Sequence, residues 1–130
     1  MLDVGKTASS LVRILIADDH RNLRESMRSV VSLDADFRVV AEARDGLEAI
    51  ELCRLHRPDL VIMDKSMPRL NGLEATRLLK EELPGIAVLV ASLDRLSRSE
   101  AVSCGAEGYV SKLAGAEEQL RAMRKALGRK

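Results

Sequence analysis

Residues 60–64 read Leu-Val-Ile-Met-Asp, a short apolar run that ends on the carboxylate of Asp64. A second apolar run, residues 12–17, ends in the same way on Asp18 and Asp19. Short apolar runs of this kind are typical of strands that are buried on both faces of a parallel sheet. Functional groups in such sheets gather at the carboxyl ends of the strands. If the two strands are neighbours, the carboxylates of Asp18, Asp19 and Asp64 are therefore expected to converge.

Three carboxylates at one place predict a bound cation. Like charges at short distance repel and raise each other's pKa unless a cation lies among them. Oxygen ligands on open loops suit a hard cation such as Mg²⁺, which keeps several of its waters. The sequence therefore predicts a Mg²⁺ pocket with one carboxylate left to do chemistry.

Strand and helix signals alternate along the whole chain. Pro58 ends the second helix, Asn71 can cap the third, and Gly105 ends the fourth. Repeated right-handed strand–helix–strand units predict a flavodoxin-like, doubly wound three-layer α/β sandwich with a five-stranded parallel sheet. We expect strands near residues 12–17, 37–41, 60–63, 86–91 and 108–110, and helices near 20–33, 45–57, 72–82, 96–104 and 116–127.

Composition argues against several classes of function. A chain of 130 residues is long enough for one domain with a sizeable core. The net charge of +1 and an aromatic content of 2% give no basis for direct nucleic-acid binding. No apolar stretch is long enough to span a bilayer. Cys53 and Cys104 are read as reduced core residues of a cytoplasmic protein. Residues 1–10 are expected to be a disordered leader, and residues 11–130 a single domain.

Six motifs in a fixed order point to a known family. They read ILIADDH at residues 14–20, ARDGLEA at 43–49, PDLVIMD at 58–64, MPRLNG at 67–72, VLVAS at 88–92 and GAEGYVSK at 105–112. Together they resemble the receiver domain of bacterial two-component response regulators, over about residues 11–127. The first and last motifs are most similar to the LuxR/FixJ-type branch, whose helix-turn-helix output domain is not part of this sequence. The chain would be a stand-alone receiver or a truncated regulator.

The resemblance implies a role for each residue of the acidic pocket. Asp64 would be the phosphoacceptor, because its position matches the family's phosphorylated aspartate. Asp19 would bind Mg²⁺ directly, Asp18 through a water, and Ser66 through its backbone carbonyl. A metal at this place neutralises and orients an incoming phosphoryl group, which a carboxylate alone would repel.

Further family residues end the fourth and fifth strands. The hydroxyl of Ser92 would bond one phosphoryl oxygen, and the ammonium of Lys112 would pair with another. Movement of Ser92 would let Tyr109 turn inward and change the face made by residues 96–104, 108–110 and 116–127. That face, or the first and fifth helices, would form a homodimer. Such a switch would control an output, namely transcription regulation by a separate DNA-binding domain.

The resemblance also implies a partner. A sensor histidine kinase or phosphotransfer protein must bring a phosphohistidine to the pocket. No contact with a membrane is expected. The start of the first helix, with exposed His20, Asn22 and Arg24, and the loop at residues 65–69 would form its docking surface. His20 and His56 are read as exposed helix residues, since the phosphorylated histidine of this family lies on the partner.

The chain departs from the family pattern at three places. Lys65 follows the phosphoacceptor position directly, where it would either repel Mg²⁺ or steady the phosphoryl group. The segment between Ser92 and Lys112 is slightly shorter than usual, which bears on the switch. Leu113 stands where many receivers have a proline.

Other classes of function fit less well. A haloacid-dehalogenase-type phosphatase needs a second acid two residues after its aspartate, and Ser66 stands there. A flavodoxin-like carrier needs a hydroxyl-rich loop after the first strand, and a dinucleotide binder needs Gly-x-Gly-x-x-Gly. Ser92 alone could cap the fourth helix. The alternative that stays open is a receiver-like interaction module with impaired switching.

Overall fold

The computed structural model describes residues 11–94 and 98–128, and the expected leader lies outside this part of the chain. Strands and helices alternate as the sequence predicts. The strands are β1 (Val12–Ala17), β2 (Phe37–Ala43), β3 (Leu60–Asp64), β4 (Ala87–Ser92) and β5 (Gly108–Ser111). The helices are α1 (Arg21–Val31), α2 (Gly46–His56), α3 (Gly72–Glu82), α4 (Arg98–Cys104) and α5 (Ala116–Ala126).

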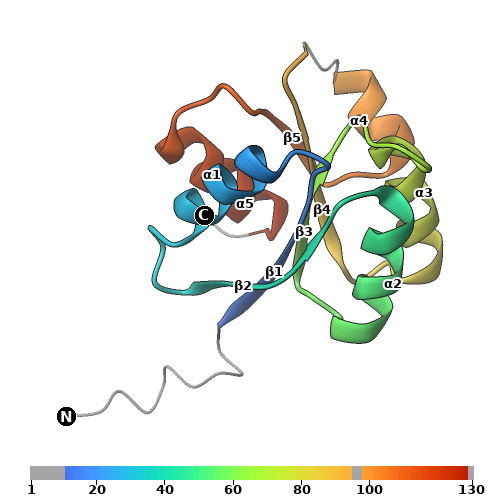
Figure 1. The fold of residues 1–130 in the computed structure, drawn as a ribbon, viewed down its shortest axis with the longest axis horizontal. Coiled ribbons are helices and arrows are strands. Elements are labelled where there is room, and N and C mark those ends of the chain that lie inside the picture. Colours follow the sequence, from blue (N-terminus) through green and yellow to red (C-terminus); the bar gives the residue numbers. More distant parts are fainter. Residues whose placement is uncertain (1–10, 95–97, 129–130) are drawn as a thin grey trace.

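The five strands form one parallel sheet in the order β2-β1-β3-β4-β5. Helices α1 and α5 cover one face of this sheet, and α2, α3 and α4 cover the other (Figure 1). This is the expected doubly wound, flavodoxin-like sandwich. The strand order reverses at β1 and β3, so the helices that follow these strands lie on opposite faces. Ligands of open α/β sheets bind outside the carboxyl ends of the strands at such a switch point.

Both faces of the sheet are apolar, because side chains alternate between the two faces along each strand. In β3, Leu60 and Ile62 pack on the side of α1 and α5, whereas Val61 and Met63 pack on the side of α2 and α3. All four are at most 2% exposed. Burial on both faces explains why this strand reads as a continuous apolar run. It also makes Asp64 the first polar group that the strand presents at its end.

Side-chain caps and one close backbone contact fix the helices that follow β2 and β3. The carboxylate of Asp45 accepts a hydrogen bond from the Glu48 amide at the start of α2. The Asn71 side chain accepts one from the Glu74 amide and caps α3, as predicted. A Cβ atom on Gly72 would lie only 1.8 Å from the carbonyl oxygen of Asp64. The absence of a side chain at residue 72 therefore lets α3 begin directly against the end of β3.

Some element boundaries differ from the expected ones. β2 continues to Ala43 and β4 includes Ser92, so both strands reach further toward the site than predicted. α4 spans Arg98–Cys104, and residues 96–97 of the predicted helix lie outside the described residues. Cys53 and Cys104 are buried and free, as expected. Within the described ranges, no helix has the length and apolar character needed to cross a membrane.

Candidate functional site

Four strands deliver the candidate residues to one edge of the sheet. Asp64 is the last residue of β3 and Ser92 the last of β4, while Asp18 and Lys112 directly follow β1 and β5. Backbone hydrogen bonds hold these strand ends in register. The Lys112 amide donates to the Ser92 carbonyl at 2.9 Å, and the Asp18 amide donates to the Ala43 carbonyl at 3.0 Å. The convergence predicted from the apolar runs is therefore present.

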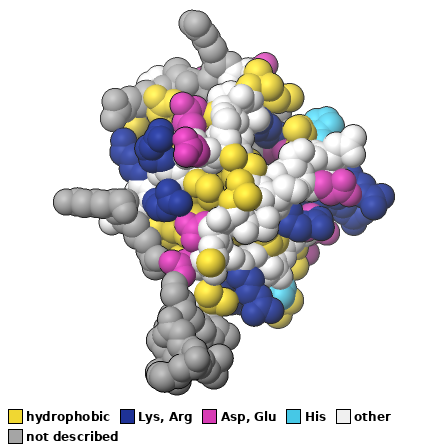
Figure 2. All heavy atoms as spheres, turned by 90° about the vertical axis from the view of Figure 1, so that its left-hand side faces the viewer, with side chains coloured by type: hydrophobic (Ala, Val, Ile, Leu, Met, Phe, Trp, Pro, Cys, Tyr) yellow, Lys and Arg dark blue, Asp and Glu magenta, His cyan; other side chains and the backbone are white. Residues whose placement is uncertain are grey.

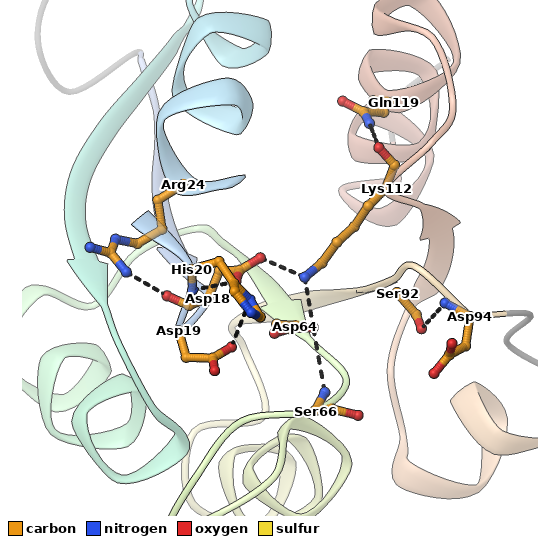
Figure 3. A network of polar contacts seen from close by, with 10 residues as sticks. All are labelled: Asp18, Asp19, His20, Arg24, Asp64, Ser66, Ser92, Asp94, Lys112 and Gln119. Carbon is orange, nitrogen blue, oxygen red and sulfur yellow. Dashed lines mark hydrogen bonds and ion pairs between the residues drawn. The ribbon is translucent and has the colours of Figure 1, made fainter. Parts of the chain in front are cut away.

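Lys112 joins the two buried carboxylates of the site. Its Nζ lies 2.6 Å from Oδ2 of Asp18 and 2.8 Å from Oδ1 of Asp64 (Figure 3). The three side chains are only 6–7% exposed. An ammonium group at this place offsets charge repulsion between the two carboxylates. The contact also gives the lysine of the last motif a defined position.

Burial makes the carboxyl of Asp64 unusually hard to ionise. Loss of hydration raises its pKa to about 6, and the nearby charge of Asp18 acts in the same direction. The hydrogen bond from Lys112 opposes both effects. A carboxylate that carries an unfavourable charge in the fold favours the arrival of a cation or the covalent neutralisation of its oxygen.

Asp18 and Asp19 are held differently. Oδ1 of Asp18 accepts a hydrogen bond of 2.9 Å from the His20 amide. The backbone carbonyl of Asp18 accepts one of 2.7 Å from Nη1 of Arg24. The side chain of Asp19 is 30% exposed and lies 3.2 Å from Nδ1 of His20. Asp18 is therefore fixed within the fold, whereas Asp19 faces the open side of the pocket.

The acidic cluster has the composition of a site for a hard cation. Ligand atoms of Asp18, Asp19, His20 and Asp64 all lie within 4.8 Å of one another. The carboxylate oxygens suit Mg²⁺, and the exposure of Asp19 leaves space for the waters that this ion retains. The sequence predicts His20 as an exposed helix residue near the pocket and not as a metal ligand. Its ring is 63% exposed, as expected, but it lies 3.4 Å from Asp18 and belongs to the cluster.

Three further predicted residues lie around this centre. The Ser66 amide donates a long hydrogen bond of 3.4 Å to Oδ1 of Asp64. Ser92 is buried, and its hydroxyl accepts the Asp94 amide at 3.0 Å (Figure 3). The prediction that Ser92 caps the fourth helix is wrong, because the residues that directly follow it, Leu93 and Asp94, are not helical. Tyr109 on β5 is 42% exposed, so its ring is turned toward solvent.

The structure also assigns partners to two cations near the pocket. Nζ of Lys65 lies 3.0 Å from Oε2 of Glu100 in α4, so this lysine links the loop after β3 to α4. Arg24 is only 13% exposed and lies 3.4 Å from Glu42, in addition to its bond with the Asp18 carbonyl. The expectation that Arg24 is an exposed docking residue is therefore wrong. It holds the loop after β1 in place.

Comparisons with known proteins agree with this geometry. A family model described as the response regulator receiver domain matches residues 14–124. A two-component response regulator of the LuxR family from Aurantimonas sp. SI85-9A1 has a TM-score of 0.87 and 35% identity, over 93% of this chain and 89% of that one. The response regulator domain of Thermotoga maritima CheB has a TM-score of 0.82 and 30% identity, over 92% of this chain and 98% of that one.

Curated relatives are much longer than the segment that matches. The transcriptional regulatory protein DegU of Brevibacillus brevis is 38% identical over 60 residues, which are 46% of this chain and 25% of DegU. A protein-glutamate methylesterase/protein-glutamine glutaminase of Pyrococcus abyssi is 42% identical over 60 residues, which are 16% of that protein. Both relatives share one segment with this chain and extend far beyond it. The extent of the family match and the fold together show that the chain belongs to the receiver domains of two-component response regulators.

Proposed function

We propose that the protein accepts a phosphoryl group on Asp64 in a Mg²⁺-dependent reaction, with a sensor histidine kinase or phosphotransfer protein as donor. The observation that carries this proposal is the arrangement of Asp64 between a buried ammonium and an acidic cluster. Nζ of Lys112 lies 2.8 Å from Oδ1 of Asp64. Ligand atoms of Asp19 and Asp64 belong to a cluster whose members all lie within 4.8 Å of one another. Phosphoryl transfer requires these parts, namely a nucleophile, a metal site and charge neutralisation.

The contacts of Asp64 distinguish its two oxygens. Lys112 and the Ser66 amide both approach Oδ1, which leaves Oδ2 as the nucleophile. Oδ2 attacks the phosphorus of the donor phosphohistidine, a P–O bond forms, and the P–N bond breaks with its electron pair moving to the imidazole. Lys112 then balances the charge of the phosphoryl oxygens.

Asp19, Asp64 and the Ser66 carbonyl would hold the metal directly, and Asp18 would act through a water. Bound Mg²⁺ supplies Lewis-acid polarisation of the phosphoryl oxygens and charge neutralisation. Asp18 already has both carboxylate oxygens engaged, one by Lys112 and one by the His20 amide. Its fixed position favours an outer role, whereas the more exposed Asp19 is free to turn toward the ion.

Phosphorylation would change the conformation of Ser92 and Tyr109. The Ser92 hydroxyl would leave the Asp94 amide and donate to a phosphoryl oxygen, and Tyr109 would turn from solvent into the space that opens. The face of α4, β5 and α5 would then change its affinity for an output partner. Such a regulator would control transcription through a separate DNA-binding domain, as the name of DegU suggests for that relative.

A second candidate is a receiver that is phosphorylated but does not switch. The segment between Ser92 and Lys112, which contains α4, is slightly shorter than in the family pattern, and this favours it. The same helix is tied to the loop after β3 by Lys65 and Glu100. Both candidates share the phosphorylation step and differ in whether the α4 surface then rearranges.

Intact-mass measurement with acetyl phosphate and Mg²⁺ tests the phosphorylation step. We expect one added phosphoryl group, which EDTA and the Asp64→Asn substitution both remove. Asp59→Asn is the matched control, because Asp59 is an exposed aspartate directly before the first residue of β3. Equal labelling of Asp64→Asn and wild type would overturn the assignment of the phosphoacceptor.

A further inference from the structure

A cavity of about 200 Å³ lies between α1 and α5, on the inner side of the phosphorylation site. Its floor is the apolar sheet surface, and its outer walls come from the two helices. Asp64 and Lys112 form its end nearest the site. Figure 2 shows the α1/α5 face of the molecule, where hydrophobic side chains gather near the middle with charged side chains around them. Further lining residues are Ile16, Leu23, Ser26, Met27, Val30 and Gln119.

Gln119 adds a polar group to the cavity, in addition to Asp18, Ser26, Asp64 and Lys112. The residue is only 5% exposed, and its Nε2 donates to the carbonyl of Lys112 at 3.3 Å. This bond fixes the orientation of the amide, since a flipped amide would place its oxygen against a carbonyl. Oε1 of Gln119 is buried without a hydrogen-bond partner in the described residues. In Figure 3, Oε1 is turned away from Lys112 and toward α1.

A buried polar atom without a partner is rare in folded proteins and points to a missing group. The group is either a water held by Oε1 and a second polar side chain of the cavity, such as Ser26, or a ligand that fills the apolar part lined by Leu23, Met27 and Val30. Oε1 can only accept a hydrogen bond. A ligand must therefore bring its own donor and an apolar body.

We propose that the cavity is a binding site for a small aromatic molecule that carries one N–H or O–H donor. An apolar cavity of about 150 Å³ is known to hold benzene, so the space here suits a ring with one polar group. The donor would bond Oε1 of Gln119, and the ring would lie against Met27, Val30 and the stem of Lys112. A ligand whose only polar group is a carbonyl would be rejected, because its oxygen would face Oε1.

Lys112 connects the cavity to the proposed phosphorylation site. Gln119 is bonded to the backbone of Lys112, and the side chain of Lys112 is part of the cavity wall. A bound ring would restrict the motion of this side chain and change the lifetime of the phosphorylated state. This coupling rests on the proposed function, whereas binding itself does not and is measured without any phosphodonor.

Indole and indene are the probes that test the proposal, because they have nearly the same shape and only indole has an N–H. Two-dimensional NMR titration of the wild-type protein should give shifts at Met27, Val30 and Gln119 with indole. One hydrogen bond predicts roughly three- to tenfold tighter binding of indole than of indene. A preference below about twofold, or shifts confined to residues outside the cavity, would overturn the proposal.

Variants distinguish the contribution of the hydrogen bond to binding from that of the space in the cavity. Gln119→Met removes Oε1 and should abolish the preference for indole over indene. Ser26→Trp should block the cavity and weaken both probes, whereas Ser29→Trp, at an exposed position of α1 that does not line the cavity, should weaken neither. Amide spectra of each variant show whether it is folded. Retention of the indole preference in folded Gln119→Met would contradict the assigned contact, even if phosphorylation of Asp64 is normal.

Discussion

Asp64 carries an unfavourable charge in the metal-free fold, and this has a measurable consequence for stability. Its pKa is about 6 in the folded protein, against an ordinary value of 3.8. The protonated form therefore favours folding fully at low pH, and this contribution is lost as the pH rises through 6. We expect Asp64→Asn to be more stable than wild type at pH 7.5 in EDTA, by at most about 3 kcal/mol. At pH 4 the two proteins should be nearly equal.

Urea unfolding at the two pH values measures this difference. Asp59→Asn, an exposed control at the opposite end of β3, should show no such pH-dependent gain. Adding Mg²⁺ should narrow the gap at pH 7.5, because a ligand that binds the folded wild type stabilises it. A gain that is the same at both pH values would show that the charge of Asp64 is not its cause.

Arg24 acts inside the fold, so its substitution should affect every phosphodonor. Nη1 of Arg24 holds the carbonyl of Asp18 at 2.7 Å, and Glu42 lies 3.4 Å from its Nε. Arg24→Glu should slow labelling by acetyl phosphate as well as by a kinase, because the loop that carries Asp18 loses its anchor. Arg21→Glu is the control, since Arg21 is 83% exposed on the same helix. Loss of kinase transfer alone in Arg24→Glu would restore the docking interpretation.

At this scale the sequence predicts residues at strand ends better than contacts between elements. Asp18 and Asp64 follow apolar runs, so their place at one edge depends only on the order of the strands, whereas Lys112 is predicted from the family resemblance. The roles of Arg24 and Gln119 depend on how α1 and α5 pack against the loops after β1 and β5. No periodic signal in the sequence carries that information.

Elements with strong end signals are predicted to the residue. α3 spans Gly72–Glu82 as expected, because Asn71 caps its start and Pro84 follows its end. α4 ends at Cys104, directly before Gly105, as expected. Its start has no such signal, and the predicted start falls at residues outside the described part of the chain. β2 extends beyond its apolar run to Ala43, because backbone pairing with β1 continues past it.

The contact between α3 and β3 predicts a strict requirement for glycine at residue 72. A Cβ there would lie 1.8 Å from the Asp64 carbonyl oxygen, and backbone at this distance must move. We expect Gly72→Ala to lower the free energy of unfolding by at least about 2 kcal/mol. Gly85→Ala is the matched control, because nothing lies within 4 Å of a Cβ at that position. Chemical denaturation of both variants measures the difference, and equal stability would show that α3 adapts easily.

For the whole molecule, the arrangement of strands explains why one edge carries the chemistry. The reversal of strand order at β1 and β3 places their carboxyl ends side by side, with helices leaving to opposite faces. β4 and β5 then extend the same edge and add Ser92 and Lys112. The strand order is seen in the structure. The fold class and the acidic part of the site follow from one pattern of apolar runs that end on polar residues. The state of the α4 surface does not, because it depends on loop length and on pairs such as Lys65 with Glu100.

That surface decides between the switching and non-switching candidates, and beryllofluoride with Mg²⁺ as a phosphoryl mimic tests it by NMR. A switching receiver should show shifts in the pocket and also at Tyr109 and along α4, because Ser92 leaves the Asp94 amide and the space beside β5 is refilled. The pair of Lys65 and Glu100, 3.0 Å apart, opposes this motion by tying α4 to the loop after β3. Lys65→Met should therefore enlarge the shifts along α4, whereas Lys125→Met, at an exposed position on α5, should not. Shifts that stay within the pocket in both wild type and Lys65→Met would establish the non-switching module.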